Sequence, residues 1–162
     1  MLETTLCYLH HEGKVLMLHR VKKAHDVNEG KWIGIGGKIE AGETPETCML
    51  REFREETGAV PTNLAYRGIV NFDSGDWQER MHLFTATGYE GRITDCDEGV
   101  LCWIPEAELL KLSLWEGDRV FLSLLSQGEP FFELDLLYQG ETLVSACLNG
   151  QKLPLSAFVP VS

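Results

Sequence analysis

The sequence predicts an α+β fold with a mixed β-sheet, and three observations lead to this fold class. Short apolar stretches typical of strands recur along the chain, one strongly marked helix interrupts them, and the order lacks regular βα alternation. The length of 162 residues suits a single domain spanning 1–162, with a core from about residue 4 to 148 and a C-terminal tail. We therefore expect an α+β fold or a mixed-sheet sandwich.

The N-terminal part is predicted to hold two strands and a third, shorter one. Thr4–His10 and Lys14–Arg20 are rich in apolar residues and flank a turn that contains glycine, which is typical of a hairpin. The stretch 21–31 is polar and is expected to be a loop. Trp32–Ile35 is short and apolar, and we expect the glycine pair that follows to break it.

The best-defined element is a helix over Pro45–Thr57. Thr44 suits the N-cap, because its hydroxyl can accept a hydrogen bond from an N–H of the first turn, and proline suits the first helical position. Gly58 suits the left-handed cap at the C-terminal end. The sequence therefore places both ends of this helix.

The rest of the chain is predicted to contain further strands and two short helices. The last two strands flank the turn residues 139–141, so we expect a C-terminal hairpin. The tail after Gly150 has no clear period. The expected strands are Tyr66–Asp73, Met81–Tyr89, Gly99–Ile104, Phe131–Tyr138 and Thr142–Leu148, and the expected helices are Pro105–Lys111 and Asp118–Ser126.

The charge balance excludes one class of partner. There are 25 acidic and 14 basic residues, for a formal net charge of −11. Binding to a nucleic-acid polymer needs a basic surface, so this class is not expected. A small phosphorylated substrate stays compatible, because a bound cation can invert the field of an acidic site.

The cysteines and the apolar stretches indicate the compartment. Five cysteines without C-x-x-C spacing suggest neither a disulfide framework nor a zinc site. The first residues lack the basic start and apolar run of a signal peptide, and no apolar run approaches the ~20 residues that span a bilayer. We expect a cytoplasmic protein without membrane contact, either a monomer or a homodimer.

Three glutamates of the predicted helix point to a metal site. Glu52, Glu55 and Glu56 are related by i, i+3 and i+4 spacing, so they share one face, while Phe53 falls on another side and can anchor the helix to the core. Crowded carboxylates repel one another, and a divalent cation offsets that repulsion. An all-oxygen ligand set suits Mg²⁺, with Mn²⁺ as a substitute. The alternative is an acidic helix face exposed to water.

The loop before the helix favours the metal site. Gly36 and Gly37 let the backbone come close to a metal or phosphate, and Lys38 adds a cation that can meet phosphate oxygens. Glu43 precedes the helix, and Arg51 lies one turn from the carboxylates. A phosphate-binding loop beside a metal-binding helix predicts a site for a diphosphate.

These residues fill the pattern G-x5-E-x7-R-E-U-x-E-E-x-G-U, in which U is a bulky apolar residue. The chain resembles the Nudix hydrolase family, whose signature this is, with Ala59 at the last apolar position as a smaller residue than usual. The matched residues are Gly37, Glu43, Arg51, Glu52, Phe53, Glu55, Glu56 and Gly58.

The resemblance implies an α/β/α sandwich and a role for each motif residue. Glu52, Glu55 and Glu56 would hold the metal, with the Gly36 carbonyl and a loop carboxylate, Glu98, completing the set. Arg51 and Glu43 would orient the loop and helix. Water would attack a phosphorus of a nucleoside diphosphate derivative, and one of the helix glutamates would take its proton.

The likeness extends beyond the motif to the MutT-type purine nucleoside triphosphate hydrolases that act on 8-oxo-dGTP. By that resemblance Trp115 stacks on the base and Asp118 bonds its edge. Ile33 and Gly117 depart from the pattern, because that branch has an asparagine and a second acidic residue there. The resembling stretches are 30–38, 102–103 and 114–118.

The remaining substrate contacts are expected around these two sites. Tyr8 is expected in the base pocket, and Arg20, Lys23 and Lys38 are expected to meet the phosphates together with Gly37. The predicted activity is a Mg²⁺-dependent nucleoside triphosphate pyrophosphohydrolase that sanitises the nucleotide pool. The alternatives are a Nudix enzyme for ADP-ribose or a dinucleoside polyphosphate, and a non-catalytic nucleotide-binding module.

Overall fold

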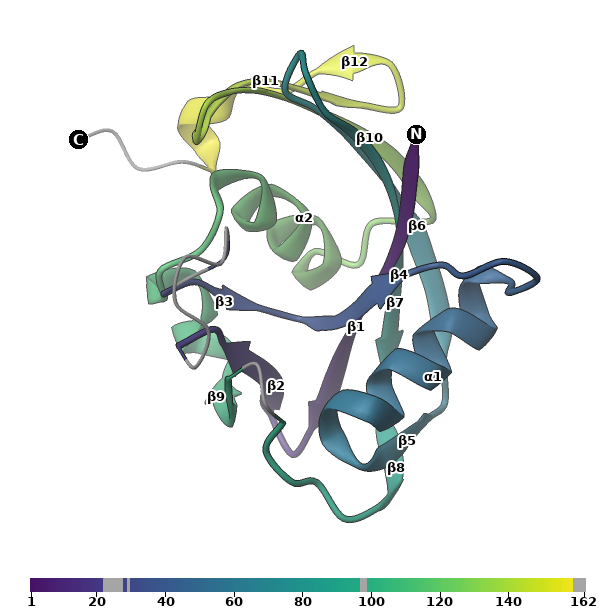
Figure 1. Ribbon diagram of the computed structural model, residues 1–162. Helices are drawn as coiled ribbons and strands as arrows, with labels where there is room; N and C mark the ends of the chain where they lie inside the picture. Colours follow the sequence, from purple (N-terminus) through teal and green to yellow (C-terminus); the bar gives the residue numbers. More distant parts are fainter. Residues whose placement is uncertain (22–27, 29, 97–98, 159–162) are drawn as a thin grey trace.

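A mixed β-sheet lies between two α-helices in the computed structural model, which describes residues 1–21, 28, 30–96 and 99–158 (Figure 1). The helices are α1 (Pro45–Thr57) and α2 (Glu116–Ser126), with short 3₁₀ helices η1 (Glu106–Lys111) and η2 (Leu155–Ala157). The strands are β1 (Leu2–His11), β2 (Lys14–His19), β3 (Trp32–Ile33), β4 (Ile35–Lys38), β5 (Ala59–Thr62), β6 (Ala65–Asp73), β7 (Gln78–Ala86), β8 (Gly88–Gly91), β9 (Val100–Pro105), β10 (Phe132–Gln139), β11 (Thr142–Leu148) and β12 (Gln151–Lys152).

The main sheet of the described residues runs in the order β12-β11-β10-β6-β7-β1-β2-β3, and β4 and β9 join it by pairing with β1 and β2. The pairs β1–β7 and β6–β10 are parallel, whereas the other pairs are antiparallel. Along one edge of β1, residues 4–7 pair with β4 and residues 9–11 pair with β2. This fork brings the glycine-rich β4 into the middle of the molecule (Figure 1).

Each face of the sheet buries a separate apolar core. Cys7 and Leu9 of β1 face α1, where they pack with Met49 and Phe53, both fully buried. Tyr8 faces the other way, into the core around α2. The alternation follows from the strand period of two. The structure is thus a layered α/β/α arrangement, as the fold class predicted.

Most of the predicted elements are confirmed. Helix α1 has the predicted bounds, with the Thr44 side chain accepting a hydrogen bond from the Thr47 N–H and Gly58 in the left-handed conformation at φ 81°. The N-terminal hairpin and the C-terminal hairpin are present within one or two residues of their expected bounds. Residues 106–111 form a 3₁₀ helix rather than an α-helix.

One expectation about the glycine pair was wrong. Gly36 and Gly37 do not end a strand but lie inside β4, which pairs with β1. A Cβ on Gly36 would come within 1.8 Å of the Thr5 carbonyl oxygen, so only glycine permits this close approach of the two backbones. The sequence also gave no sign of β5, where a proline stands in a strand of a two-stranded sheet with β8.

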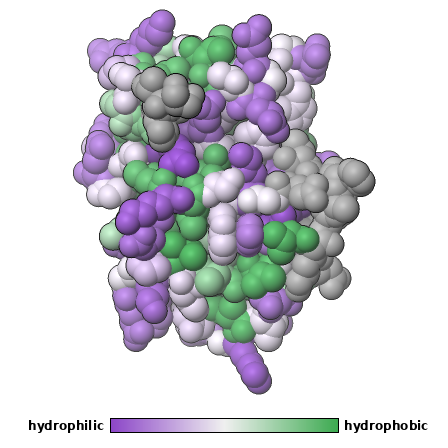
Figure 2. Space-filling model, turned by 90° about the vertical axis from the view of Figure 1, so that its left-hand side faces the viewer, coloured by the Kyte–Doolittle hydropathy of each residue, from purple (hydrophilic) through white to green (hydrophobic). Residues whose placement is uncertain are grey.

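The surface on the side of β3 and α2 mixes apolar and polar residues. Figure 2 shows hydrophobic residues as a discontinuous green band across this face, bordered by hydrophilic side chains. Such a mixture is ordinary for a surface in contact with water. Neither α-helix in the described ranges has the length and apolar character needed to span a membrane.

Candidate active site

Helix α1 positions the predicted acidic residues because its opposite side is locked into the core. Met49 and Phe53 are fully buried beneath the sheet, which fixes the rotation of the helix about its axis. Glu52 then lies beside Gly37 of β4. Glu56 is only 9% exposed, whereas the Glu55 side chain is 60% exposed. The three carboxylates thus share a face but differ sharply in burial.

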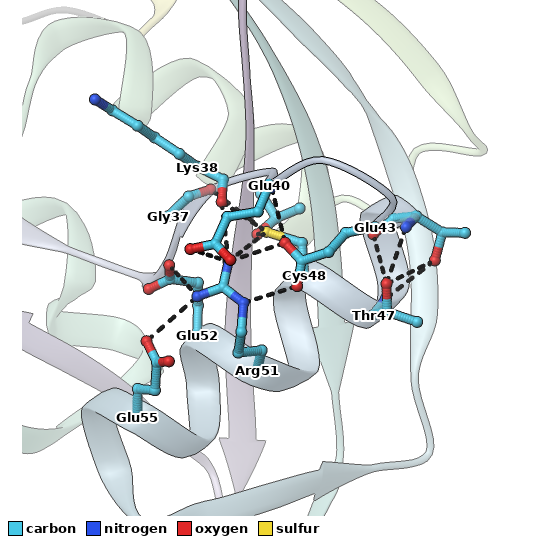
Figure 3. Close-up of polar contacts among 11 residues, drawn as sticks. Gly37, Lys38, Glu40, Glu43, Thr47, Cys48, Arg51, Glu52 and Glu55 are labelled. Atoms are coloured by element: carbon cyan, nitrogen blue, oxygen red, sulfur yellow. Dashed lines mark hydrogen bonds and ion pairs between the residues drawn. The ribbon is translucent and has the colours of Figure 1, made fainter.

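Arg51 is the centre of a hydrogen-bond network that joins the helix to the preceding loop (Figure 3). Its Nε and Nη2 donate to the two oxygens of Glu43 at 2.7 and 2.9 Å. Its Nη1 donates to Glu52 at 2.8 Å and to Glu55 at 3.3 Å, and Nη2 also donates to the Lys38 carbonyl at 3.1 Å. The fork of a guanidinium suits this paired geometry, which a lysine could not reproduce.

The network perturbs the protonation of Glu43. Hydrogen bonds from Arg51, and then from the Glu40 N–H, lower the pKa of Glu43 to about 2. The same pairing raises the pKa of Arg51 above its ordinary value. Both groups are therefore charged over the whole neutral range, and they hold the 38–43 loop against the helix.

The backbone of β4 comes very close to the carboxylate of Glu52. A Cβ on Gly37 would lie 2.4 Å from the Glu52 carboxyl carbon, so a side chain at this position would fill the space beside the carboxylate. Cys48 also ties the helix to the loop, donating from Sγ to the Lys38 carbonyl at 3.3 Å. The Lys38 side chain itself points away from the carboxylates in Figure 3.

Within the described ranges, no three acidic, histidine or cysteine side chains are arranged to hold a metal ion. Arg51 forms ion pairs with Glu52 and Glu55. The donor set still fits a hard cation, because it consists of carboxylate oxygens around a space that Gly37 leaves open. Glu98, the expected loop ligand, lies outside the described residues. Gly36 is held in β4, directly beside Gly37.

A cavity of about 430 Å³ opens on the α2 side of the sheet. This volume lies within the range of sites for small molecules. It is largely apolar, with a few carboxyl groups. The lining residues are Leu6, Asn28, Ile33, Phe72, Asp73, Ser74, Trp77, Glu79, Met81, Trp115, Asp118, Tyr138, Gly140 and Glu141.

Trp115 and Asp118, the two residues that the resemblance places at the base, both line this cavity. The Trp115 Nε1 donates to the Asn28 side-chain oxygen at 2.8 Å, and Tyr138 meets the indole edge-to-face with ring centroids 6.2 Å apart. Lys31 Nζ lies 5.3 Å from the centre of the indole ring. These contacts fix the ring plane. Asp118 lies in the first turn of α2 and is 6% exposed.

Burial sets the protonation of Asp118. It raises the pKa of this carboxyl to about 8, with a further contribution from the negative charge of Glu79 and an opposing one from Lys31. Asp118 is therefore mostly protonated at neutral pH, so it can both donate and accept a hydrogen bond. No hydrogen bond or ion pair of its side chain is found within the part of the chain that the structure describes.

The structure separates the other predicted contact residues. Ile33 lines the cavity, whereas Tyr8 is fully buried and packs against Phe121, with ring centroids 6.2 Å apart. Tyr8 therefore lies behind the cavity rather than in it. Arg20 is half-buried next to β2, away from the lining, and Lys23 falls outside the described residues.

Gly117 does not line the cavity, and its surroundings leave no room for a side chain. Its N–H donates to the Tyr138 hydroxyl at 2.7 Å. A Cβ would come within 2.6 Å of both that hydroxyl and the Leu136 side chain. The acidic residue of the resembling branch is absent at this position, and the Tyr138 side chain occupies the space that it would need.

Sequence reasoning missed the cavity residues that come from β6, β7 and the C-terminal hairpin. Phe72, Trp77, Glu79 and Tyr138 belong to no motif, and only the parallel pairing of β10 with β6 brings Tyr138 to this face. The alternation of apolar and polar residues along a strand indicates which side chains share a face, but it does not indicate which strands become neighbours.

Comparison with known proteins identifies the family. The NUDIX domain family matches residues 3–125, which is most of the chain. The chain belongs to the Nudix hydrolase family. Its Nudix box is the loop and helix that Arg51 joins, and enzymes of this family generally use divalent metal ions.

Relatives agree over most of the chain. The chain is similar to an uncharacterized Nudix hydrolase, YvcI of Bacillus subtilis, with 30% identity over 92% of this chain and 95% of that protein. It is 32% identical to an oxidized purine nucleoside triphosphate hydrolase of Danio rerio, over 78% of this chain and 81% of that protein. A solved MutT mutator protein of Bacillus halodurans superposes with a TM-score of 0.83 and 27% identity, covering 93% and 99% of the two chains. The MutT-type Nudix fold is thus confirmed.

Proposed function

We propose that this Nudix hydrolase is a Mg²⁺-dependent pyrophosphohydrolase of purine nucleoside triphosphates, with 8-oxo-dGTP or a related modified purine triphosphate as its substrate. The products are the nucleoside monophosphate and pyrophosphate. The observation that carries the proposal is the 430 Å³ cavity with Trp115 and the buried Asp118 on its wall. Relatives named for oxidized purine triphosphates and 8-oxo-dGTP support the choice of substrate.

The residues of the cavity provide a binding mode for a purine. The indole of Trp115, held by Asn28 and Tyr138, offers a fixed face for stacking. Stacking of a base on an aromatic side chain contributes about 1–3 kcal/mol. The protonated Asp118 carboxyl then reads the edge of the base, since it both donates and accepts.

The Nudix box supplies the reactive half of the proposed site. Glu52, Glu55 and Glu56 are the candidates to hold Mg²⁺, and Arg51 and Glu43 keep the loop and helix in register. When bound, the cation neutralises charge on the phosphate oxygens and lowers the pKa of the attacking water. A carboxylate of the helix takes the proton of that water. Leu6, which lines the cavity, pairs with Gly36, directly before the box, so the two halves adjoin.

A nucleotide panel tests the proposal. Purified protein with Mg²⁺ is given 8-oxo-dGTP, dGTP, dATP, dCTP, ADP-ribose and a dinucleoside polyphosphate, and pyrophosphate and phosphate are measured separately. We expect the highest kcat/KM with a purine triphosphate and release of pyrophosphate. Glu56→Gln should lower kcat by about 100-fold or more, whereas Glu46→Gln, an exposed residue of the same helix, should not.

Two results would overturn the proposal. Faster cleavage of ADP-ribose or a dinucleoside polyphosphate would assign the enzyme to another Nudix substrate. Nucleotide binding without any turnover would identify a binding module. Wild-type kcat in the Glu56→Gln variant would remove Glu56 from the metal site.

A further inference from the structure

Glu79 lies in the cavity among the residues that a base would contact, although no motif includes it. It stands on β7 two residues before Met81, and both line the cavity. Strand alternation places these two side chains on the α2 face of the sheet, together with Leu6 of the neighbouring β1. Glu79 is half-buried and therefore faces the cavity rather than open solvent.

The protein fixes one oxygen of this carboxylate. The Thr4 hydroxyl, itself 9% exposed, donates to Glu79 Oε2 across the parallel β1–β7 pair. Oε1 has no hydrogen-bond or ion-pair partner within the described ranges. A carboxylate with one oxygen held and the other available is oriented for a ligand that donates hydrogen bonds.

Asp118 gives an independent indication that this cavity takes a polar ligand edge. Its carboxyl is buried on the cavity wall, and its hydrogen-bonding capacity is unused within the described ranges. A buried carboxyl without a partner is costly unless a ligand supplies one. Glu79 is close enough for its negative charge to act on Asp118.

The position where a second acid is expected from the family pattern cannot provide one. The Tyr138 hydroxyl and Leu136 fill the space at Gly117. We propose that Glu79 supplies the second base-reading carboxylate of this cavity and, with Asp118, selects a purine whose Watson–Crick edge presents adjacent N–H donors, as guanine does. This inference rests on the proposed function, because it names the base of that substrate.

The donors and acceptors of the two carboxyl groups match such an edge. An ionised carboxylate only accepts hydrogen bonds. Burial raises the pKa of Glu79, and the hydrogen bond from Thr4 opposes this by favouring the ionised form. A protonated Asp118 can donate to a carbonyl oxygen. Guanine presents two neighbouring donor groups and a carbonyl oxygen on this edge. Adenine presents one amino group beside a ring-nitrogen acceptor, which would face Glu79 unfavourably.

Binding of the monophosphates tests the inference without relying on turnover. Titration calorimetry with dGMP and dAMP gives Kd for the wild type, Glu79→Gln, Glu79→Met and Thr4→Val. Glu90→Gln, an exposed glutamate on β8, is the matched control. We expect the wild type to prefer dGMP. The preference should fall by about 10- to 100-fold in both Glu79 variants, as for loss of a hydrogen bond to a charged group.

Thr4→Val should lower the same preference by a smaller factor and should have no further effect when combined with Glu79→Gln. Thermal unfolding confirms that each variant folds, and Glu79→Met removes the polar group should the glutamine variant be unstable. A wild type that binds the two nucleotides equally, or Glu79 variants that keep the preference for dGMP, would overturn the inference. The nucleotide panel tests the proposed function separately. A protein that hydrolyses other nucleotides can still have a base-selective site that depends on Glu79, so the two proposals can fail independently.

Discussion

The stability of the Nudix box should depend strongly on the ion pair between Arg51 and Glu43. Both guanidinium-to-carboxylate hydrogen bonds are short, at 2.7 and 2.9 Å, and they bridge eight residues from loop to helix. Substitution of either residue leaves the other without its main partner. We therefore predict a strong pairwise coupling energy in a double-mutant cycle of Glu43→Gln and Arg51→Met.

The magnitude follows from geometry and burial. The side chains of Arg51 and Glu43 are 25% and 17% exposed, so the pair lies between a surface and a buried ion pair. A surface pair contributes at most about 1 kcal/mol, and loss of one partner of a buried pair costs about 3–5 kcal/mol. The coupling energy is therefore expected to exceed that of an ordinary surface pair and to stay below the cost of breaking a buried pair, and each single variant should unfold at a lower Tm than the wild type.

Urea unfolding of the wild type, the two single variants and the double variant, all in EDTA, measures this coupling. The folded pKa of Glu43, about 2, lies below its ordinary value of 4.5. Its contribution is therefore fully present above pH 4.5 and is lost as the pH falls through 2. A coupling below about 0.5 kcal/mol at pH 7 would refute the reasoning, because it would mean that solvent screens the pair.

Two further predictions concern the cavity. Asp118→Asn should raise Tm relative to the wild type by an amount that grows between pH 4 and 8, since the unfolded carboxyl ionises near 3.8 and the folded one near 8. The stabilisation that the protonated carboxyl gives the folded wild type is fully present below the unfolded pKa and is lost as the pH rises through the folded pKa. A Tm difference that does not change with pH would therefore contradict the burial argument. Trp115→Ala should raise KM for purine triphosphates by about 10- to 100-fold while Mg²⁺ affinity stays unchanged. An unchanged KM in steady-state assays would place the base elsewhere.

The sequence was sufficient to predict the parts of the site that follow local rules. The bounds of α1 depend on Thr44, Pro45 and Gly58, whose effects act within a few residues, and the structure reproduces them. The spacing of Glu52 and Glu56 fixes a common face for the same reason. Trp115 and Asp118 were found by resemblance, and both line the cavity.

The features that the sequence did not predict depend on which strands become neighbours. Gly36 was expected to break a strand, because the pattern does not reveal that β1 would approach it closely. Glu79 has the same local setting as many exposed strand residues, and only the partnership with Thr4 sets it apart. Tyr8 was expected in the base pocket and shares the α2 face of β1 with Leu6, but it packs against Phe121 of α2 and is fully buried.

Strand β1 explains how the two halves of the site are held together. Thr4 contacts Glu79 on the cavity side, whereas the next residue, Thr5, contacts Cys48 of α1 on the other side, with Oγ1 and Sγ 3.4 Å apart. The side chain of Leu6 again lines the cavity, and its backbone pairs with Gly36, directly before the box. Consecutive residues of a single strand thus connect the cavity to the carboxylate helix through backbone pairing. Because the side chains proposed to read the base project from the opposite face to the helix, substitutions at Ile33 or Glu79 are expected to alter base selection while the Nudix box keeps its geometry.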